Sequence, residues 1–469
     1  MQTLSPLPAD LDWCFDPLVL QRHDRAGPRY TSYPTAPHFH EGFGRNELTQ
    51  ALLASNETGR ALSLYVHIPF CSSPCFYCGC NRVITRDRSR GLAYVARVLR
   101  EADQIAAVLT PGREVIQLHL GGGTPNFLDA EAMRLLIDGL RMRFALSSSP
   151  QRDFSIELDP RFVTPAEVMQ LAALGFNRAS LGVQDFDPQV QVAINRVQGV
   201  EQTLDIIRAC RAAGMRSVNV DLIYGLPGQT RQGFGRTLEQ VLAERPDRLA
   251  VYGYAHLPHL FRAQRQIDEQ QLPAPEQKLA LLGLAVQRLS AAGYQYVGMD
   301  HFALPEEDLS RAQRAGQLHR NFMGYTTHGD SDLIGLGVSA ISNIGRTYSQ
   351  NPRDLPGWEE RVDAGLLPIW RGVRLDDDDL LRAEVIQQLM CQGEVDLAQL
   401  GQRHGIDYRH YFADALQSLQ QLQDDGLAQQ AHGRVRVTAQ GRPLLRLLAM
   451  CFDRYLEQPG IGPRYSRAI

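Results

Sequence analysis

Four cysteines lie within ten residues of this 469-residue sequence, in the segment CSSPCFYCGC at positions 71 to 80. Cys71, Cys75 and Cys78 have the spacing C-x3-C-x2-C and directly follow a predicted strand, so a loop can wrap the three thiolates around one corner of a cluster. Thiolates are the ligands of iron–sulfur clusters. Three ligands leave one iron of a four-iron cluster open, which is typical of a catalytic metal site. The pattern therefore predicts a cluster that takes part in chemistry.

The same segment has a second interpretation, a four-cysteine zinc site that uses Cys80 as the fourth ligand. The single residue between Cys78 and Cys80 is unfavourable for zinc, and no second cysteine pair follows about 12 to 20 residues later. If Cys80 is not a ligand, we expect its thiol to lie near the active site. There it either donates a hydrogen atom or packs under a cofactor, or it is a small buried residue without a chemical role.

The elements that must position this loop alternate between strands and helices. Their β-branched and aromatic content predicts strands at 62–68, 115–123, 153–159, 178–184, 217–225 and 248–255. Helices are predicted at 91–109, 130–144, 164–174, 200–213, 231–244 and 275–292. This order predicts an α/β fold with a parallel sheet and right-handed crossovers. We expect an incomplete (β/α)6 barrel, because no G-x-G-x-x-G follows the first strand.

Polar or small residues stand at the C-terminal ends of these strands, where the ligands of parallel β/α folds bind. They are His67, Gly121 to Gly123, Glu157, Gln184, Asp221 and Ala255. We expect the six ends to converge on one site. Any one residue alone could instead cap a helix or satisfy loop backbone, and His67 and His119 are more simply core histidines satisfied by their neighbours.

Three segments are expected along the chain. Residues 1–60 form an N-terminal segment that covers the active site, 61–350 the partial barrel, and 360–469 a smaller, mostly helical C-terminal domain. The helices of this last domain are followed by a hairpin pattern at 427–438, an order that resembles a winged helix. A DNA-binding regulator is one alternative, but the domain is not strongly basic, and a small helical domain packed on the barrel is the simpler interpretation.

Composition narrows the class of protein. Hydrophobic residues make up 44% and charged residues 21%, as in a soluble enzyme. The 52 acidic residues outnumber the 48 basic ones, so no nucleic-acid partner is expected. The N-terminus carries no secretory signal pattern, and no apolar run approaches the ~20 residues of a membrane span. We therefore expect a cytoplasmic protein without a membrane partner.

The cysteine triad, with Tyr77 before the third cysteine, resembles the signature of radical S-adenosylmethionine enzymes. Further motifs, among them GPRYTSYPT, LYVHIPFC, LHLGGGTP, SIELDP, LGVQDF and VNVDLIYGLPGQT, extend from about residue 27 to 345. Together they resemble the family of oxygen-independent coproporphyrinogen III oxidases. That resemblance implies haem biosynthesis, in which two propionate side chains of coproporphyrinogen III become vinyl groups through a 5′-deoxyadenosyl radical, giving protoporphyrinogen IX. It also implies a [4Fe-4S] cluster, S-adenosylmethionine (two molecules per chain), an electron donor such as a flavodoxin, and a monomer.

The resemblance also assigns residues. Cys71, Cys75 and Cys78 would hold the cluster, and Tyr65 and Cys80 are the candidate catalytic residues. The contacts of the first S-adenosylmethionine would be Tyr65, Gly122, Glu157 and Ile341. Those of the second would be Tyr77, Gly123, Thr124, Gln184, Arg196, Asp221 and Ala255. We expect Arg196 and Asp221 to act as a pair of opposite charges that suits a zwitterionic amino acid.

Two arginines, Arg29 and Arg320, are candidates for the carboxylates of the substrate, although each could equally be a surface arginine. The alternative function within the superfamily is that of a haem chaperone, which binds haem without oxidising a porphyrinogen. Haem chaperones lack the CGC extension and the long N-terminal segment that this sequence has, and this difference favours the oxidase.

Overall fold

A computed structural model describes residues 16–456 and residue 465. The chain divides into two compact units, which we call the barrel unit and the accessory unit. The barrel unit consists of His38–Arg288 and Asp330–Arg374. The accessory unit is drawn from Met1–Pro37, Leu289–Gly329 and Leu375–Ile469, as far as these are described.

The barrel unit is built on one long sheet whose strands run in the order β9-β8-β7-β6-β4-β1-β14-β15-β16-β17. The six strands from β9 to β1 are parallel neighbours, and β14 continues parallel to β1 before the last three turn antiparallel. Their bounds are β1 (Leu62–Ile68), β4 (Glu114–Gly122), β6 (Asp153–Leu158), β7 (Arg178–Gln184), β8 (Ser217–Tyr224), β9 (Arg248–Gly253), β14 (Asp332–Leu336), β15 (Ile341–Ile344), β16 (Thr347–Gln350) and β17 (Arg371–Arg374). Short strands complete the unit: β2 (Phe70–Cys71), β3 (Val83–Ile84) and β5 (Ala145–Leu146).

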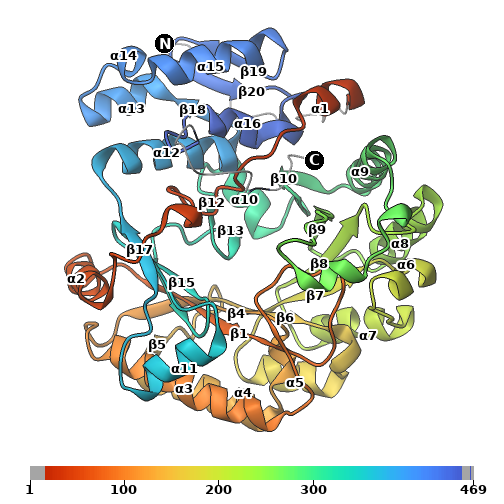
Figure 1. Ribbon diagram of the computed structural model, residues 1–469, viewed down its shortest axis with the longest axis vertical. Coiled ribbons are helices and arrows are strands. Elements are labelled where there is room, and N and C mark those ends of the chain that lie inside the picture. The colour runs from red at the N-terminus through yellow and green to blue at the C-terminus, as the bar shows by residue number, and fades with distance from the viewer. Residues whose placement is uncertain (1–15, 457–464, 466–469) are drawn as a thin grey trace. The chain divides into compact units, whose positions relative to one another are not determined.

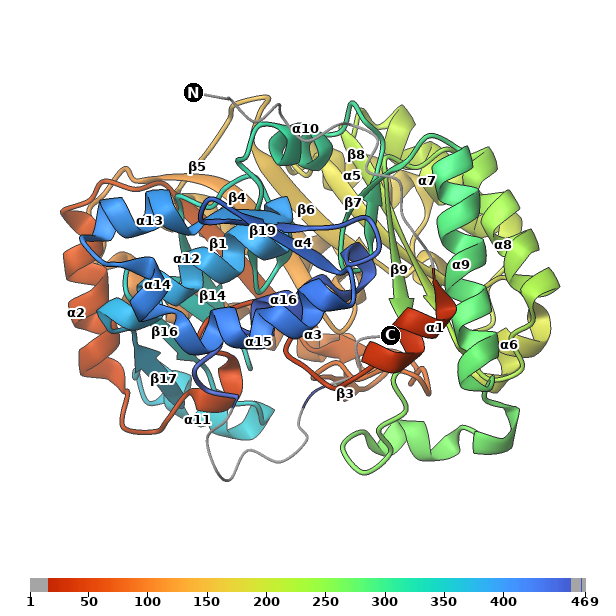
Figure 2. The ribbon, with the colours of Figure 1, turned by 90° about the horizontal axis from the view of Figure 1, so that it is seen from above.

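Helices cover the outer face of the parallel strands (Figures 1 and 2). They are α3 (Ser89–Ala106), α4 (Ala130–Arg143), α5 (Pro165–Ala173), α6 (Pro188–Ala193), α7 (Val200–Ala212), α8 (Arg231–Ala243) and α9 (Pro275–Ala291), with α2 (Arg45–Asn56) and α11 (Leu355–Asp363) beside the later strands. Their starts are specified locally. In α5, Thr164 and Glu167 form a capping box ahead of Pro165, which satisfies amide groups that would otherwise lack partners.

The predicted α/β fold class and all six predicted strand–helix pairs are confirmed, with boundaries that differ by up to three residues. The sheet continues further than predicted, through β14 to β17. These strands have only four or five residues each, and three of them pair antiparallel, so they lack the strand–helix alternation on which the prediction depended.

The accessory unit contains mostly short helices. They are α1 (Pro17–His23), α10 (Asp308–Arg314), α12 (Asp377–Gln392), α13 (Leu397–His404), α14 (Tyr408–Tyr411), α15 (Ala413–Asp424) and α16 (Leu445–Met450). Its strands are β10 (Gln295–Gly298), β11 (His301–Ala303), β12 (His319–Asn321), β13 (Gly324–Thr326), β18 (Glu394–Asp396), β19 (Ala428–Ala431) and β20 (Arg434–Val437).

The winged-helix-like order predicted for the C-terminal region is present. The hairpin β19–β20 is joined by β18 into a three-stranded sheet, and α13 and α15 pack against it (Figure 2). In the helical part of this domain, α14 and α15 are separated at Phe412, whose ring is buried against Phe452. Among the described residues, no helix is both long enough and apolar enough to cross a bilayer.

Candidate active site

The cysteine loop leaves the end of β1 and is fastened on both sides. On one side, β2 pairs in parallel with β3, and the amide of Thr85 donates to the carbonyl of Cys71 at 3.0 Å. On the other side, the amide of Phe76 donates to the carbonyl of Ile194 at 2.9 Å. The loop is therefore held to the barrel at its beginning and at its middle.

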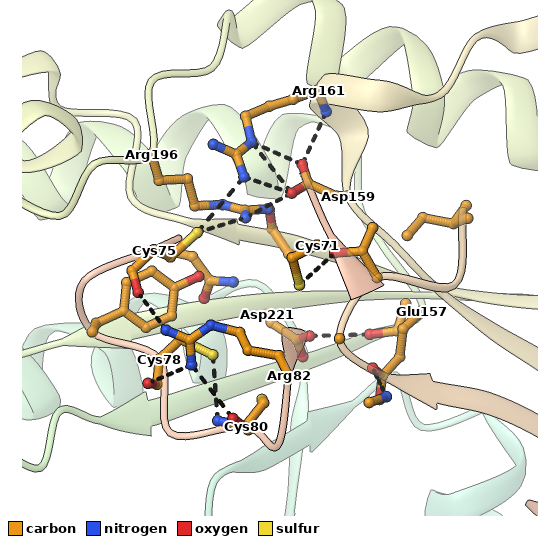
Figure 3. A pocket seen from close by; sticks show the side chains of 18 of the residues that line it. Cys71, Cys75, Cys78, Cys80, Arg82, Glu157, Asp159, Arg161, Arg196 and Asp221 are labelled. Carbon is orange, nitrogen blue, oxygen red and sulfur yellow. Dashed lines mark hydrogen bonds and ion pairs between the residues drawn. The ribbon is translucent and has the colours of Figure 1, made fainter. Parts of the chain in front are cut away.

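Each of the three predicted cluster ligands has a different hydrogen-bonding partner at its sulfur (Figure 3). The sulfur of Cys71 lies 3.3 Å from the hydroxyl oxygen of Thr124. The sulfur of Cys75 accepts from Arg196 at 3.5 Å and from Arg161 at 3.6 Å. The sulfur of Cys78 accepts from the backbone amide of Cys80 at 3.4 Å. Donors of this kind stabilise thiolate sulfur and fit a metal-bound thiolate.

The pKa values of the cysteines differ with their surroundings. A hydrogen bond from the Cys80 thiol is the main cause that lowers the pKa of Cys78 to about 6, so Cys78 is largely a thiolate at neutral pH. Burial raises the pKa of Cys71 to about 11. Iron binding at Cys71 would have to displace the proton of its thiol, so loading of such a site would depend on pH.

Among the described residues, no three His, Cys, Asp or Glu side chains are grouped so as to hold a single metal ion. Cys71, Cys75 and Cys78 all line one cavity, and three thiolates around one cavity fit a cluster held by cysteine ligands.

That cavity has a volume of about 340 Å³, within the range of small-molecule sites. All four cysteines line it, and side chains from the ends of β4, β6, β7 and β8 complete the wall. The predicted site residues among them are Cys71, Cys75, Cys78, Cys80, Tyr77, Gly122, Gly123, Thr124, Glu157, Gln184, Arg196 and Asp221. The parallel strands thus bring most of the predicted residues to one place, as their positions at strand ends implied.

Glu157, at the end of β6, is oriented by His119 on the neighbouring strand. The Nε2 atom of His119 lies 3.3 Å from the Glu157 carboxylate, and the amide of Gly122 donates to the same carboxylate at 3.2 Å. Burial raises the pKa of Glu157, but the hydrogen bonds from His119 and Gly122 outweigh it and leave the pKa below its usual value. Glu157 is therefore an anion that faces the cavity at neutral pH.

Asp221, on β8, has the opposite shift. Its carboxylate accepts from Asn219 at 2.8 Å and from Ser180 at 3.1 Å. Burial is the main cause that raises its pKa to about 7, and the negative charge of Glu157 adds to the rise. The cavity therefore holds one permanent anion and one carboxyl group that titrates near neutrality.

Gln184 ends β7 in a left-handed conformation, with φ at +67°, which is uncommon for a residue other than glycine. Its side-chain oxygen is buried and has no hydrogen-bonding partner among the described residues. A buried amide oxygen in a cavity wall fits a ligand that carries an N–H or O–H donor.

The strained turn at Gln184 is held by Asp185, which sequence reasoning missed. The buried Asp185 carboxylate accepts from Gln229 at 2.6 Å, from Thr237 at 2.7 Å and from the amide of Asp187 at 2.8 Å. A signal was present in the sequence, since an acidic residue directly follows a polar strand end.

Arg196 does not face the ligand space as a free cation. Its guanidinium forms an ion pair with Asp159 at 3.0 Å, and it donates to the carbonyl of Gly182 at 2.5 Å. The structure shows no direct pair between Arg196 and Asp221 among its described ion pairs, because Asp159 is nearer. Asp159 and its second partner, Arg161, line the same cavity and were not predicted.

Three predicted contact residues, Tyr65, Ala255 and Ile341, are not part of the cavity wall. The hydroxyl of Tyr65 lies 2.9 Å from Nδ1 of His67, whose Nε2 lies 2.9 Å from the carbonyl of Asn81 at the exit of the cysteine loop. His67 is thus buried and satisfied by neighbours, as expected, and it links Tyr65 to that loop.

Ala255 is tied to the loop through Gln264, a buried residue that was not predicted. The Gln264 amide donates to the carbonyl of Tyr77 at 2.9 Å and to that of Ala255 at 3.2 Å. Ile341 begins β15, and its backbone lies directly against Gly335 on β14.

The two arginines proposed for the substrate carboxylates lie in the accessory unit. Arg29 forms an ion pair with Asp300. Arg320 is 4% exposed, so it is not a surface arginine; it lies over the ring of Tyr325 and donates to the carbonyl of Arg29.

Comparison with known proteins shows the family of this chain. Residues 65–241 match the Radical SAM superfamily, and residues 375–444 match the HemN C-terminal domain. The chain is 49% identical to the oxygen-independent coproporphyrinogen III oxidase of Pseudomonas aeruginosa over 97% of this chain and 99% of that protein. It is 45% identical to the protein of the same name from Escherichia coli, over 98% and 99% of the two chains.

The fold agrees as well. The solved structure of coproporphyrinogen III oxidase (HemN) from Escherichia coli, described as a radical SAM enzyme, superposes with a TM-score of 0.90 at 44% identity, covering 95% of this chain and 100% of the other. This chain belongs to the oxygen-independent coproporphyrinogen III oxidase family of the radical S-adenosylmethionine superfamily.

Proposed function

We propose that this protein converts coproporphyrinogen III to protoporphyrinogen IX without oxygen, by oxidative decarboxylation of two propionate side chains to vinyl groups. The observation that carries the proposal is the convergence of the cysteine loop with Glu157, Gln184 and Asp221 on one cavity. The names of the relatives, which are identical to this chain at 45% to 49% of positions over nearly its whole length, point to the same reaction.

The residues present fit a [4Fe-4S] cluster and S-adenosylmethionine. Cys71, Cys75 and Cys78 would bind three irons, and their sulfurs already have hydrogen-bond donors within 3.6 Å. When bound, the cluster and S-adenosylmethionine supply an electron and a carbon radical that removes a hydrogen atom from the substrate propionate. The protein must hold the reacting atoms in near contact, because positioning supplies much of the catalysis.

The cavity wall suits a ligand with both a cationic and a polar part. Glu157 is an anion that accepts hydrogen bonds only, so it would hold an ammonium or ribose hydroxyl group of S-adenosylmethionine. Gln184 would accept from a second donor, and Asp221 in its ionised form would attract a cation. Arg196 forms an ion pair with Asp159, so we propose that it shapes the wall and the Cys75 environment rather than acting as a free anion receptor.

We carry the remaining assignments forward as proposals. Tyr65, Gly122, Glu157 and Ile341 would contact one S-adenosylmethionine, and Tyr77, Gly123, Thr124, Gln184, Arg196, Asp221 and Ala255 a second. Tyr65 would act through its link to His67, since its side chain is not in the cavity wall. Cys80 would act as a thiol beside the cluster and not as a ligand.

The partners and the setting of the reaction are likewise proposals. We propose a flavodoxin-like electron donor, a monomeric protein and a cytoplasmic location. The described cysteines are free thiols, which supports a reducing compartment. We also propose that the N-terminal segment of residues 1–60 covers the active site; residues 1–15 of that segment lie outside the described residues.

The test is an anaerobic assay with purified, iron-loaded protein, coproporphyrinogen III, S-adenosylmethionine and a reductant. We expect about four irons per chain and a porphyrin product whose mass corresponds to the loss of two CO2 and four hydrogen atoms. Alanine at Cys71, Cys75 or Cys78 should remove both iron and product. Stoichiometric zinc without iron, or tight haem binding without turnover, would contradict the proposed function.

A further inference from the structure

The three cysteine ligands are not equivalent in charge. The sulfur of Cys71 meets a neutral hydroxyl and that of Cys78 a backbone amide, whereas the sulfur of Cys75 meets two guanidinium groups. Figure 3 shows Arg161 and Arg196 both reaching Cys75, with Asp159 joined to the two guanidinium groups. Cys75 is therefore the one ligand with cationic donors at its sulfur among those that the structure describes.

The two guanidinium groups are fixed in place by Asp159. Arg161 donates to the two carboxylate oxygens through Nε at 3.0 Å and Nη2 at 2.7 Å, and Arg196 shares the second oxygen at 3.0 Å. The side chains are buried, with exposures of 11% for Arg161, 6% for Asp159 and 7% for Arg196. Such a bidentate contact sets the direction of the guanidinium, so the Nη2 that meets Asp159 also reaches the sulfur of Cys75.

The charges at this cluster of side chains do not cancel. Two cations and one anion leave a net positive charge beside Cys75, in surroundings where water screens it weakly. Hydrogen bonds to ligand sulfur and local charge are among the factors that set the reduction potential of an iron–sulfur cluster. Because reduction adds one negative charge to the cluster, these donors stabilise the reduced form more than the oxidised form.

We infer that Arg161 raises the reduction potential of the cluster through its hydrogen bond to the Cys75 thiolate, and that Asp159 is the positioning residue that directs it there. The inference rests on the proposed function, in which Cys75 is a cluster ligand. Arg161 is the informative member of the pair, because Arg196 also donates to the carbonyl of Gly182 and is among the residues proposed to contact S-adenosylmethionine.

The experiment is a redox titration of the reconstituted cluster in anaerobic protein without S-adenosylmethionine, with dithionite as reductant and mediator dyes, followed by electron paramagnetic resonance. In Arg161→Gln we expect a lower midpoint. At the midpoint potential of the wild type, the ratio of reduced to oxidised cluster should fall about tenfold, which for one electron is about 59 mV. Arg161→Lys should lie between the two, since an ammonium group keeps the charge but cannot contact Asp159 and Cys75 as a planar fork does.

Arg152→Gln is the matched control. Arg152 lies over a phenylalanine ring and donates to backbone carbonyls. It is located at the start of β6, which is the opposite end of that strand from the cysteines. Its variant should keep the wild-type midpoint. If Arg161→Gln assembles too little iron to titrate, Arg161→Lys decides the question.

Two results would overturn the inference. One is a midpoint in the Arg161 variants that equals or exceeds that of the wild type at equal iron content. The other is loss of iron from both variants, which would make Arg161 a requirement for assembly instead of a determinant of potential. If the wild type itself binds no four-iron cluster, the proposed function fails, and the inference fails with it.

Discussion

Glu157 and Asp221 face one cavity, yet the pKa of the first is lowered and that of the second is raised to about 7. The difference arises from their partners. Glu157 receives hydrogen bonds from His119 and Gly122, whereas the half-buried Asp221 has the neutral partners Asn219 and Ser180 and is affected by the negative charge of Glu157. Sites in which two carboxyl groups have clearly different pKa values typically use the two groups in different roles.

This difference predicts a pH dependence of cofactor binding. A carboxyl group with a pKa of about 7 is mostly neutral at pH 6 and mostly ionised at pH 8, so its attraction for a cation is present above pH 7 and is lost below it. We expect S-adenosylmethionine to bind the iron-loaded protein up to about tenfold more tightly at pH 8 than at pH 6, measured by equilibrium dialysis.

Asp221→Asn should bind weakly at both pH values, with a flat profile in this range. Asp138→Asn is a suitable control, because Asp138 is exposed on α4 and should leave the profile of the wild type unchanged. A wild-type affinity that does not change between pH 6 and pH 8 would show that Asp221 does not meet the cationic part of the ligand.

Cys80 makes a second prediction at the residue scale. Its amide donates to the sulfur of Cys78, and its thiol lies in the cavity wall. Cys80 can therefore support the proposed ligand Cys78 without binding iron itself. Cys80→Ser keeps the backbone contact and nearly the same size. We expect full iron content and the cluster absorption of the wild type, but loss of most decarboxylation, measured from the porphyrin product.

Loss of iron from the Cys80 variant would instead make Cys80 a ligand and would overturn the three-cysteine assignment. Cys210→Ser provides the comparison. Cys210 is buried on α7 away from the cavity wall, so its replacement should leave iron and turnover at wild-type levels.

At the scale of elements, β7 ends at Gln184 in a left-handed backbone conformation, which is unfavourable for a residue other than glycine. Gln184 has φ at +67°, and Asp185, which follows it, is fixed by hydrogen bonds from Gln229, Thr237 and the amide of Asp187. Strain of this kind persists where the surrounding structure determines it, and it is frequent at functional sites.

Two substitutions at this position separate strain from binding. Gln184→Gly removes both the side chain and the strain, so it should be more stable than Gln184→Ala by about 1 kcal/mol in equilibrium denaturation. Both should lose affinity for S-adenosylmethionine to the same extent, since both lack the amide oxygen. Unchanged affinity in both variants would remove Gln184 from the binding site.

The elements also show what sequence can predict here and what it cannot. Alternating strands and helices imply parallel strands, and parallel strands bring Glu157, Gln184 and Asp221 to the same edge, so this part of the site follows from local pattern alone. The ion pair that Arg196 forms does not follow from this pattern. Its pairing with Asp159 depends on how a loop after β7 packs on the end of β6, and no periodicity in the sequence encodes that contact. For the same reason, the sequence does not predict the contacts of Gln264. This residue lies 187 residues after Tyr77 and 9 residues after Ala255, and it donates to the carbonyls of both.

At the scale of the whole molecule, the cysteine ligands and the cavity wall all belong to the barrel unit. Residues 16–37 of the N-terminal segment belong to the accessory unit and contact its C-terminal part. Arg22 pairs with Asp425 at 3.4 Å, and Arg446 donates to the carbonyl of Gly27 at 3.0 Å. Cluster binding and the N-terminal segment are therefore separable in an experiment.

Deletion of residues 1–29 tests the proposal that this segment covers the active site. We expect the truncated protein to keep its iron and to cleave S-adenosylmethionine reductively, because the barrel unit is complete, but to lose decarboxylation, because the radical is no longer shielded. Both reactions can be followed by mass spectrometry of the same sample.

Arg22→Ala in the full-length chain is the control for the deletion, since it breaks the ion pair with Asp425 but leaves the segment in place. It should retain porphyrin turnover. Normal turnover by the truncated protein would end the idea that the segment acts as a cover.

The three proposed cluster ligands come from one stretch of eight residues, 71–78, that lies outside the long parallel sheet and is fastened to other parts of the barrel unit by backbone contacts at Cys71 and Phe76. No strand of that sheet needs iron to find its neighbour. We therefore expect the barrel to fold before iron is delivered, with insertion of the cluster as the last step of maturation. Loss of the cluster through damage by oxygen would leave the barrel folded, so that a new cluster could be inserted into the same chain.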